Sequence, residues 1–273
     1  MLASQSLLPY LFVAMIYLAV AVDHWRNVAH AKPLKEKNVK AHSILIAIAL
    51  VMHAVLLNQS LFNGGLNLGL SNALSAIFWL TVLIYWLTDT KQRLHSLQAF
   101  VLPPAAVAVL IQYGFPESHV LPYADELLFK AHLIIAMLAY SLFTFAALHA
   151  LLMATAERNL HQKTSLLKLP DFPPIMAMET LLFRVITIGF VLLTFTLISG
   201  MLFSEQIFHQ ALKFNHKNIF TILSWLIFGG LLLGRYLNGW RGKTAIGWTL
   251  VGFVLLLLAY VGSKFVLEVI LHR

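Results

Sequence analysis

Apolar stretches of about 20 residues recur along the whole chain, and an α-helix of that length crosses the hydrocarbon core of a bilayer. We place these stretches at residues 7–23, 41–59, 68–88, 97–115, 128–154, 182–203, 218–237 and 244–271. Only 11% of the residues are charged, whereas a soluble domain carries about 25%. The sequence therefore predicts an all-α, polytopic membrane helix bundle of about eight helices, built as a single transmembrane domain over residues 1–273.

The distribution of lysine and arginine predicts how this bundle is oriented. Loops on the inner side of a membrane carry an excess of these residues. If the N-terminus lies outside, most of the 19 Lys and Arg residues fall on inner loops. We therefore predict that both termini are on the outer, periplasmic side of a bacterial inner membrane.

Several classes of function lack the residues that they need. The chain has no cysteine, which excludes disulfides and thiolate metal ligands. No Walker loop, zincin motif or nucleophile elbow is present, so we do not expect an enzyme. The lysine and arginine residues predicted on the inner loops explain the net charge of +8. We therefore expect the lipid bilayer, and not nucleic acid, as the partner.

Ionisable residues inside a bilayer are costly, so each one marks a candidate site. His53 lies within the second apolar stretch, twelve residues beyond Ala41, which is about 18 Å along a helix. This depth falls in the outer half of the membrane, and the neighbouring residues are apolar. His53 must therefore face the interior of the bundle.

His132 opens the fifth stretch from the outer side, with Lys130 before it and Tyr140 two turns further in. His53 and His132 are thus expected at similar depth, where two imidazoles could supply both axial ligands of a haem iron. His216 is a third candidate ligand, and outer lysines such as Lys217 could pair with the haem propionates. Spacing alone favours polar packing of these histidines over haem ligation.

The remaining histidines predict less. We expect His42 and His149 to be interfacial residues at helix ends, and His24 and His95 to be solvated. Small residues four apart let helix backbones approach closely in lipid. They predict helix contacts at Ser71 with Ser75 and at Gly230 with Gly234.

The second half of the chain resembles a known family in a set of ordered motifs. These are AHL and AYS within residues 131–141, RVITIGFVLLT at 184–194 followed by Gly200, FNHK at 214–217, SW at 224–225, GWRG at 239–242 and AYVGS at 259–263. They resemble the CcsA/CcmC/HemX superfamily of cytochrome c assembly proteins, and within it the short, eight-span YpjD/HemX-type inner-membrane branch. The resemblance makes residues 128–271 the cytochrome c assembly-like core.

This resemblance implies haem binding or haem handling at the outer membrane face, in support of cytochrome c-type biogenesis. It implies b-type haem as cofactor, and other maturation proteins or apocytochrome c as partners. His132 would be the family's outer haem ligand and His53 the membrane histidine of the branch. Lys217 and Trp225 occupy positions in the family's haem-presenting motif.

The chain departs from the family in that same motif. Residues 214–220 read FNHKNIF, where the family has the sequence WDPKETW. The aromatic and lysine character is kept and the acidic residues are missing. Two other readings therefore stay open: a membrane scaffold that binds no haem, and a small-molecule transporter, which ranks last because no internal repeat is visible.

Overall fold

The computed structural model describes residues 6–29, 36–62, 65–92, 94–115, 126–161, 174–208 and 216–262, and every long element in these ranges is helical. The helices are α1 (Leu7–Ala29), α2 (Glu36–Leu61), α3 (Leu70–Gln92), α4 (Gln98–Gly114), α5 (Leu127–His161), α6 (Ile175–Phe208), α7 (His216–Asn238) and α8 (Gly242–Leu257), with a short 3₁₀ helix η1 (His95–Leu97) and a π-helical turn η2 (Leu258–Gly262). In this part of the chain, 8 helices are long and apolar enough to cross a membrane. The predicted all-α membrane bundle is confirmed, and the orientation of the termini stays a prediction.

Several helices extend beyond the apolar stretches that predicted them. α2 begins at Glu36, α5 continues to His161, and α6 runs from Ile175 to Phe208. Polar residues at these ends continue the backbone hydrogen bonds beyond the hydrocarbon. Pro103 and Pro104 lie inside α4, as a membrane helix allows when neighbouring groups satisfy the freed carbonyls.

The chain forms two compact units. Unit 1 comprises residues 1–120 and 151–178, and unit 2 comprises residues 121–150 and 179–273. Helices α1 to α4 therefore belong to unit 1, and α7 and α8 to unit 2. Helix α5 passes from unit 2 into unit 1 after Ala150, and α6 passes from unit 1 into unit 2 after Met178.

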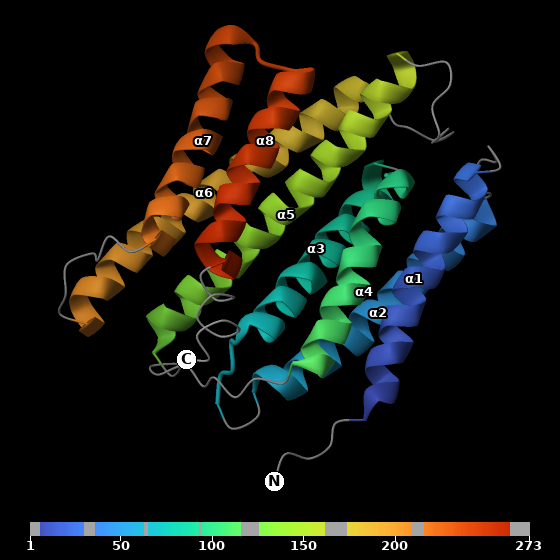
Figure 1. Ribbon diagram of the computed structural model, residues 1–273, viewed down its shortest axis with the longest axis horizontal. Coiled ribbons are helices and arrows are strands. Elements are labelled where there is room, and N and C mark those ends of the chain that lie inside the picture. Colours follow the sequence, from blue (N-terminus) through green and yellow to red (C-terminus); the bar gives the residue numbers. More distant parts are fainter. Residues whose placement is uncertain are drawn as a thin grey trace. The chain divides into compact units, whose positions relative to one another are not determined.

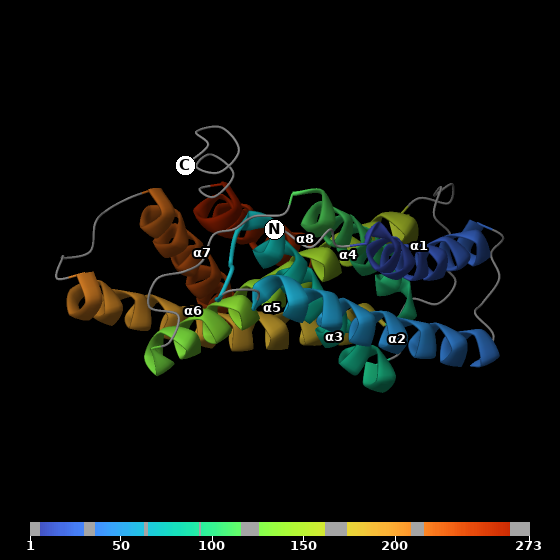
Figure 2. The same ribbon diagram turned by 90° about the horizontal axis from the view of Figure 1, so that it is seen from below.

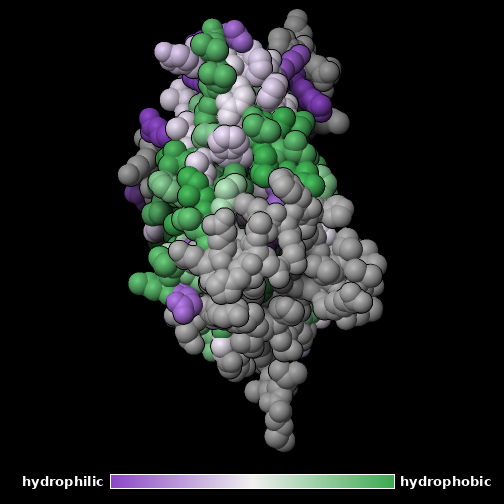
Figure 3. All heavy atoms as spheres, turned by 90° about the vertical axis from the view of Figure 1, so that its left-hand side faces the viewer, coloured by the Kyte–Doolittle hydropathy of each residue, from purple (hydrophilic) through white to green (hydrophobic). Residues whose placement is uncertain are grey.

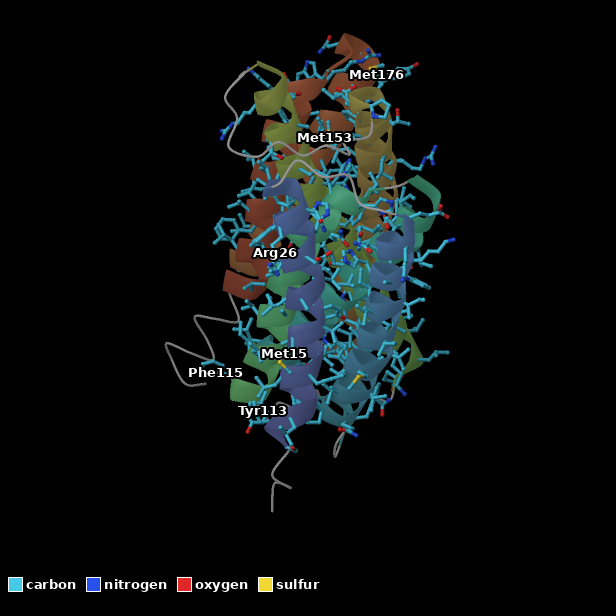
Figure 4. The ribbon with its side chains drawn as sticks, turned by 90° about the vertical axis from the view of Figure 1, so that its right-hand side faces the viewer. Met15, Arg26, Tyr113, Phe115, Met153 and Met176 are labelled. Atoms are coloured by element: carbon cyan, nitrogen blue, oxygen red, sulfur yellow. The ribbon has the colours of Figure 1, made fainter. Side chains whose placement is uncertain are left out.

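In unit 1, helices α1 to α4 form a closed set of neighbours. α1 packs on α4 and α2, and α3 packs on the same two helices; Figures 1 and 2 show α1 beside α4 in one layer and α2 beside α3 in the other. The rings of Tyr10 and Tyr113 pack in a tilted arrangement, with their centroids 5.3 Å apart. In Figure 4, Tyr113 and Phe115 lie near one end of this unit, and Arg26 lies toward the other.

Polar side chains join these helices where small residues predicted contacts. Ser71 donates to the carbonyl of Phe115 at 2.9 Å, and Ser75 donates to Gln112 at 2.6 Å. The predicted contact face of Ser71 and Ser75 is therefore confirmed as the face that α3 turns toward the end of α4.

In unit 2, aromatic side chains fill the space between the helices. Phe143 of α5 stacks on Phe228 of α7 with ring centroids 4.0 Å apart. A Cβ at Gly189 would lie 3.1 Å from the Phe143 ring, and a Cβ at Gly252 would lie 2.9 Å from the Phe228 ring. The two glycines therefore let α6 and α8 approach this stacked pair.

The turn between α7 and α8 depends on two further glycines. Gly239 and Gly242 have φ of 65° and 52°, a region that favours residues without a Cβ. The Gly242 N–H, at the first turn of α8, donates to Glu179 at 2.7 Å. Gly230 and Gly234 face Trp248 and Trp240, which confirms that this pair of small residues marks a close approach.

The outer surface of the helices is apolar, as lipid contact requires. Large exposed side chains on α6 and α7 include Ile188, Phe195, Ile198, Leu223 and Leu233. In Figure 3, apolar residues form a broad area in the coloured part of the face, and most of the hydrophilic residues lie toward its upper end. The apolar residues of the sequence thus include both side chains on the lipid-facing surface and side chains of the protein core.

Candidate functional site

His132, near the start of α5, is partly buried and bonded to α6 through one ring nitrogen. Its Nδ1 lies 2.7 Å from Ser199 Oγ. The single hydroxyl proton of Ser199 is directed to the Phe195 carbonyl at 2.7 Å. Nδ1 must therefore carry the proton and donate it to Ser199, and in the neutral ring Nε2 then carries the lone pair.

This tautomer is the one that a histidine needs to bind a metal through Nε2. A ligating imidazole usually donates its other N–H to a neighbouring acceptor, which fixes the ring and raises the basicity of the ligating nitrogen. Gly200, beside Ser199, lies next to the ring, and a Cβ there would make an ordinary van der Waals contact with His132 Cε1 at 3.5 Å.

Lys217, at the start of α7, brings a positive charge to the same part of unit 2. It interacts electrostatically with His132, and its Nζ lies 5.5 Å from the centre of the Tyr260 ring. Tyr260 packs against Tyr140 with ring centroids 5.7 Å apart, and a hydrogen bond joins Tyr140 to Thr221. The sequence-predicted residues His132 and Lys217 are thus brought together beside two tyrosines.

Trp225 lies two turns further along α7 and is fixed in place by α6. Its indole N–H donates to Thr194 Oγ1 at 2.9 Å, and its ring stacks on Phe190 at 5.4 Å. A Cβ at Gly229 would lie 3.3 Å from the Phe190 ring. The geometry makes Trp225 a packing residue between α6 and α7, with its one polar atom engaged.

His53 of α2 has a different environment, inside unit 1. Its ring is fully buried, at 0% exposure, and both nitrogens have partners. Because Ser75 donates to Gln112, His53 Nε2 must donate to Ser75 Oγ, at 2.8 Å. Nδ1 therefore accepts from the Tyr17 hydroxyl, at 3.4 Å.

These bonds form one directed chain through four helices. It runs from Tyr17 on α1 to His53 on α2, Ser75 on α3 and Gln112 on α4. Gln112 then donates to the Leu56 carbonyl of α2 at 3.5 Å. His53 is the central member of this chain, and its ring would have to release one of the two bonds before Nε2 or Nδ1 could bind a metal.

Other sequence-predicted site residues are less defined. Lys130 is exposed on α5, two residues before His132. His216 begins α7, and its side chain lies outside the described residues. His53 and His132 belong to different units, so their convergence stays a prediction.

Two predictions for the remaining histidines are wrong. His24 is 2% exposed, although it was expected to be solvated, because α1 is flanked by helices on the side where this residue lies. His95 was also expected to be solvated, and instead its Nδ1 pairs with Asp89 Oδ2 at 2.9 Å. His42 is buried as well, and its Nε2 pairs with Asp23 Oδ2 at 3.0 Å.

Sequence reasoning missed the residues that orient the two membrane histidines. Ser199, Gln112 and Tyr17 had no role assigned, Ser75 was predicted only as a helix contact, and all four lie far from their partners in the sequence. The available signal was chemical: polar side chains inside apolar stretches must find partners in the bundle. Within the described ranges, no group of three or more His, Cys, Asp or Glu residues could hold a bare metal ion.

Comparison with known proteins places these residues in a family. The chain matches the family model described as "Cytochrome C assembly protein" over residues 38–271. It is 29% identical over 230 residues to the inner membrane protein YpjD of Escherichia coli (strain K12), covering 83% of this chain and 86% of that protein. The cytochrome c biogenesis protein CcsA of Prochlorococcus marinus (strain AS9601) is 24% identical over 260 residues, covering 83% of each chain.

A second CcsA, from the alga Heterosigma akashiwo (strain NIES-293), is 25% identical over 240 residues, covering 72% of this chain and 73% of that protein. The family model covers helices α2 to α8 apart from the first two residues of α2, leaves out α1, and includes His53, His132 and Lys217. The chain is thus a multi-pass inner-membrane protein, and it belongs to the cytochrome c assembly protein family.

Proposed function

We propose that this protein binds haem, of b type, at the end of unit 2 where His132 lies, and handles it during assembly of c-type cytochromes at the inner membrane. The observation that carries the proposal is the Nδ1 bond from His132 to Ser199. It gives the imidazole the tautomer of an axial ligand, on a helix end beside a lysine.

The residues around His132 fit the chemistry of haem. Nε2 is the nitrogen that would bind iron, and Lys217 supplies a cation for a propionate carboxylate. Tyr140 and Tyr260 offer aromatic surface of the kind that packs on a porphyrin. Bound haem would supply the iron and its redox chemistry, and the chain would supply ligation, orientation and charge.

His53 is the candidate for a second axial ligand. To bind iron, it would have to give up its hydrogen bond to either Tyr17 or Ser75. His216 and Lys130 are further candidates by position on α7 and α5. The family membership supports a role in cytochrome c assembly, with other maturation proteins or apocytochrome c as partners. We assign no catalytic residue, because the proposed role is binding and presentation.

Visible spectroscopy of the purified protein tests the proposal. We expect a Soret band that is lost or strongly reduced in His132→Ala, because the variant removes the axial nitrogen. Thr196→Ala is a matched control on α6, since the Thr196 hydroxyl donates only to the Leu192 carbonyl among the bonds described. Equal haem content in wild type and His132→Ala would contradict the ligand assignment. Protein that takes up no haem at all would favour the scaffold role.

A further inference from the structure

A second polar site lies in unit 1, at the end where α1 finishes and α2 begins. A small cavity there is lined by residues of α2, α3, η1 and α4, among them His42, Asp89, His95 and Gln98. The cavity has a volume of about 10 Å³, which is about the size that holds a single water molecule. Arg26, labelled in Figure 4, belongs to the last turn of α1 near this end.

Two histidine–aspartate pairs meet at this cavity. His42 Nε2 pairs with Asp23 Oδ2 at 3.0 Å, and Asp23 also accepts from the Asn27 amide at 3.0 Å. His95 Nδ1 pairs with Asp89 Oδ2 at 2.9 Å, and Tyr85 hydrogen-bonds to Asp89 as well. In each pair, a residue that lines the cavity has one polar atom that takes no part in the pairing.

Three of the atoms around the cavity have no hydrogen-bond partner among the described residues. They are His42 Nδ1, Asp89 Oδ1 and Gln98 Nε2, and each is buried. His42 is 8% exposed and Gln98 is 2% exposed. A buried polar group left without a partner costs about 1–3 kcal/mol, so three such atoms around one cavity indicate a common ligand.

The chemistry of these atoms defines that ligand. Asp89 Oδ1 can only accept, and Gln98 Nε2 can only donate. His42 Nε2 faces a carboxylate and must carry its proton, so Nδ1 of the neutral ring accepts. The ligand must therefore donate two hydrogen bonds and accept one, which is the capacity of a water molecule with the usual three partners of a buried water.

The geometry points to a site for one tightly held water molecule that links His42, Asp89 and Gln98 across α2, α3 and α4. The water joins both pairs into one hydrogen-bonded chain, Asp23–His42–water–Asp89–His95. Half of the Asp23 side chain is exposed, at 49%, whereas Asp89 is 15% exposed. The chain thus connects a carboxylate in contact with solvent to a carboxylate inside the unit.

A structure of the full-length protein at a resolution that shows ordered water tests the site. We expect one peak within hydrogen-bond distance of His42 Nδ1, Asp89 Oδ1 and Gln98 Nε2. The same crystals soaked in thallium(I) should give no anomalous signal there. An empty cavity would overturn the proposal, and a thallium peak would overturn it in favour of a monovalent cation held by a flipped Gln98.

Two variants sharpen the test. Gln98→Leu removes the donor and fills the cavity, so we expect the water peak to be lost. Ser43→Ala is the matched control: Ser43 also lines the cavity, but its hydroxyl accepts from the Trp86 indole at 3.0 Å. We expect the peak to persist in this variant. Loss of the peak in Ser43→Ala, or its persistence in Gln98→Leu, would contradict the assigned partners, and the wild-type map decides the question if either variant fails to fold.

Discussion

His53 in unit 1 and His132 in unit 2 are both histidines in apolar helices, yet they donate to a serine through different ring nitrogens. His53 is fully buried and uses both ring nitrogens, with Tyr17 and Ser75 as partners. His132 is partly buried and is fixed through Nδ1 by Ser199. The first arrangement ties four helices together, and the second orients a ring whose Nε2 can serve a ligand.

The comparison teaches that the neighbouring serine decides which ring nitrogen carries the proton, and therefore which nitrogen could bind a ligand. In both cases a serine hydroxyl reveals the tautomer, because its one proton goes to an oxygen that can only accept. Ser75 directs its proton to Gln112 and Ser199 to the Phe195 carbonyl. Each serine thus forces its histidine to donate, through Nε2 in His53 and through Nδ1 in His132.

The largest expected effect is on the stability of unit 1. His53→Ala leaves a cavity and takes a hydrogen-bond partner from two buried groups, the hydroxyls of Tyr17 and Ser75, so we expect the free energy of unfolding to fall by about 3 kcal/mol. Denaturant titration in mixed micelles measures this change. Val51→Ala is the control on α2, since Val51 is 66% exposed and should cost less than about 1 kcal/mol. A His53→Ala protein as stable as wild type would remove the structural role.

Next in size is the effect of His132→Ala on haem. We expect haem affinity to fall at least about 100-fold, or about 2.7 kcal/mol, because the axial nitrogen is lost. Stability should change by less than about 1 kcal/mol, since one hydrogen bond of a partly buried ring is removed. Haem titration followed by Soret absorbance gives the affinity. If His53→Ala abolished haem binding and His132→Ala left it intact, the roles of the two histidines would be reversed.

A smaller effect is expected when the orienting serine is removed. Ser199→Ala should weaken haem binding about 10-fold, in the range that loss of a partner to a ligating histidine produces. The variant keeps His132, so a band should remain with a shifted maximum. Thr196→Ala, one turn earlier on α6, should leave both affinity and spectrum unchanged. Identical behaviour of the two variants would show that the Nδ1 bond does not act on the ligand.

The smallest effect is expected at Lys217. Lys217→Met removes the cation that lies over Tyr260 and that we propose to pair with a propionate. The side chain is exposed, so we expect a loss of about threefold in haem affinity, or ~0.6 kcal/mol. The loss should shrink as salt is added, because screening weakens exposed pairs. An effect independent of salt would place the contribution of Lys217 in packing instead.

Much of the fold could be predicted from the sequence. Each of the eight apolar stretches corresponds to one helix, including α4, which contains Pro103 and Pro104. The small residues Ser71, Ser75, Gly230 and Gly234 lie at close approaches. These features follow from local chemistry, because a backbone in lipid must satisfy its own hydrogen bonds.

The partners of the histidines could not be predicted in the same way. Ser75 is 22 residues from His53, and Ser199 is 67 residues from His132. The apolar stretches predict that a polar residue within them faces the interior of the bundle, but they do not predict which helix lies opposite that residue. For the same reason, His24 and His95 were predicted to be solvated and are instead buried or paired.

Apolar length and composition alone determined that this chain spans a membrane as a bundle of helices, since the bilayer allows a buried backbone few other forms. The packing of those helices decided which histidine has both nitrogens bonded, which has its tautomer set for a ligand, and where polar atoms surround a cavity. Hydrogen bonds are short and directional, so residues distant in sequence acquire such roles only when the tertiary structure brings them within about 3 Å of each other.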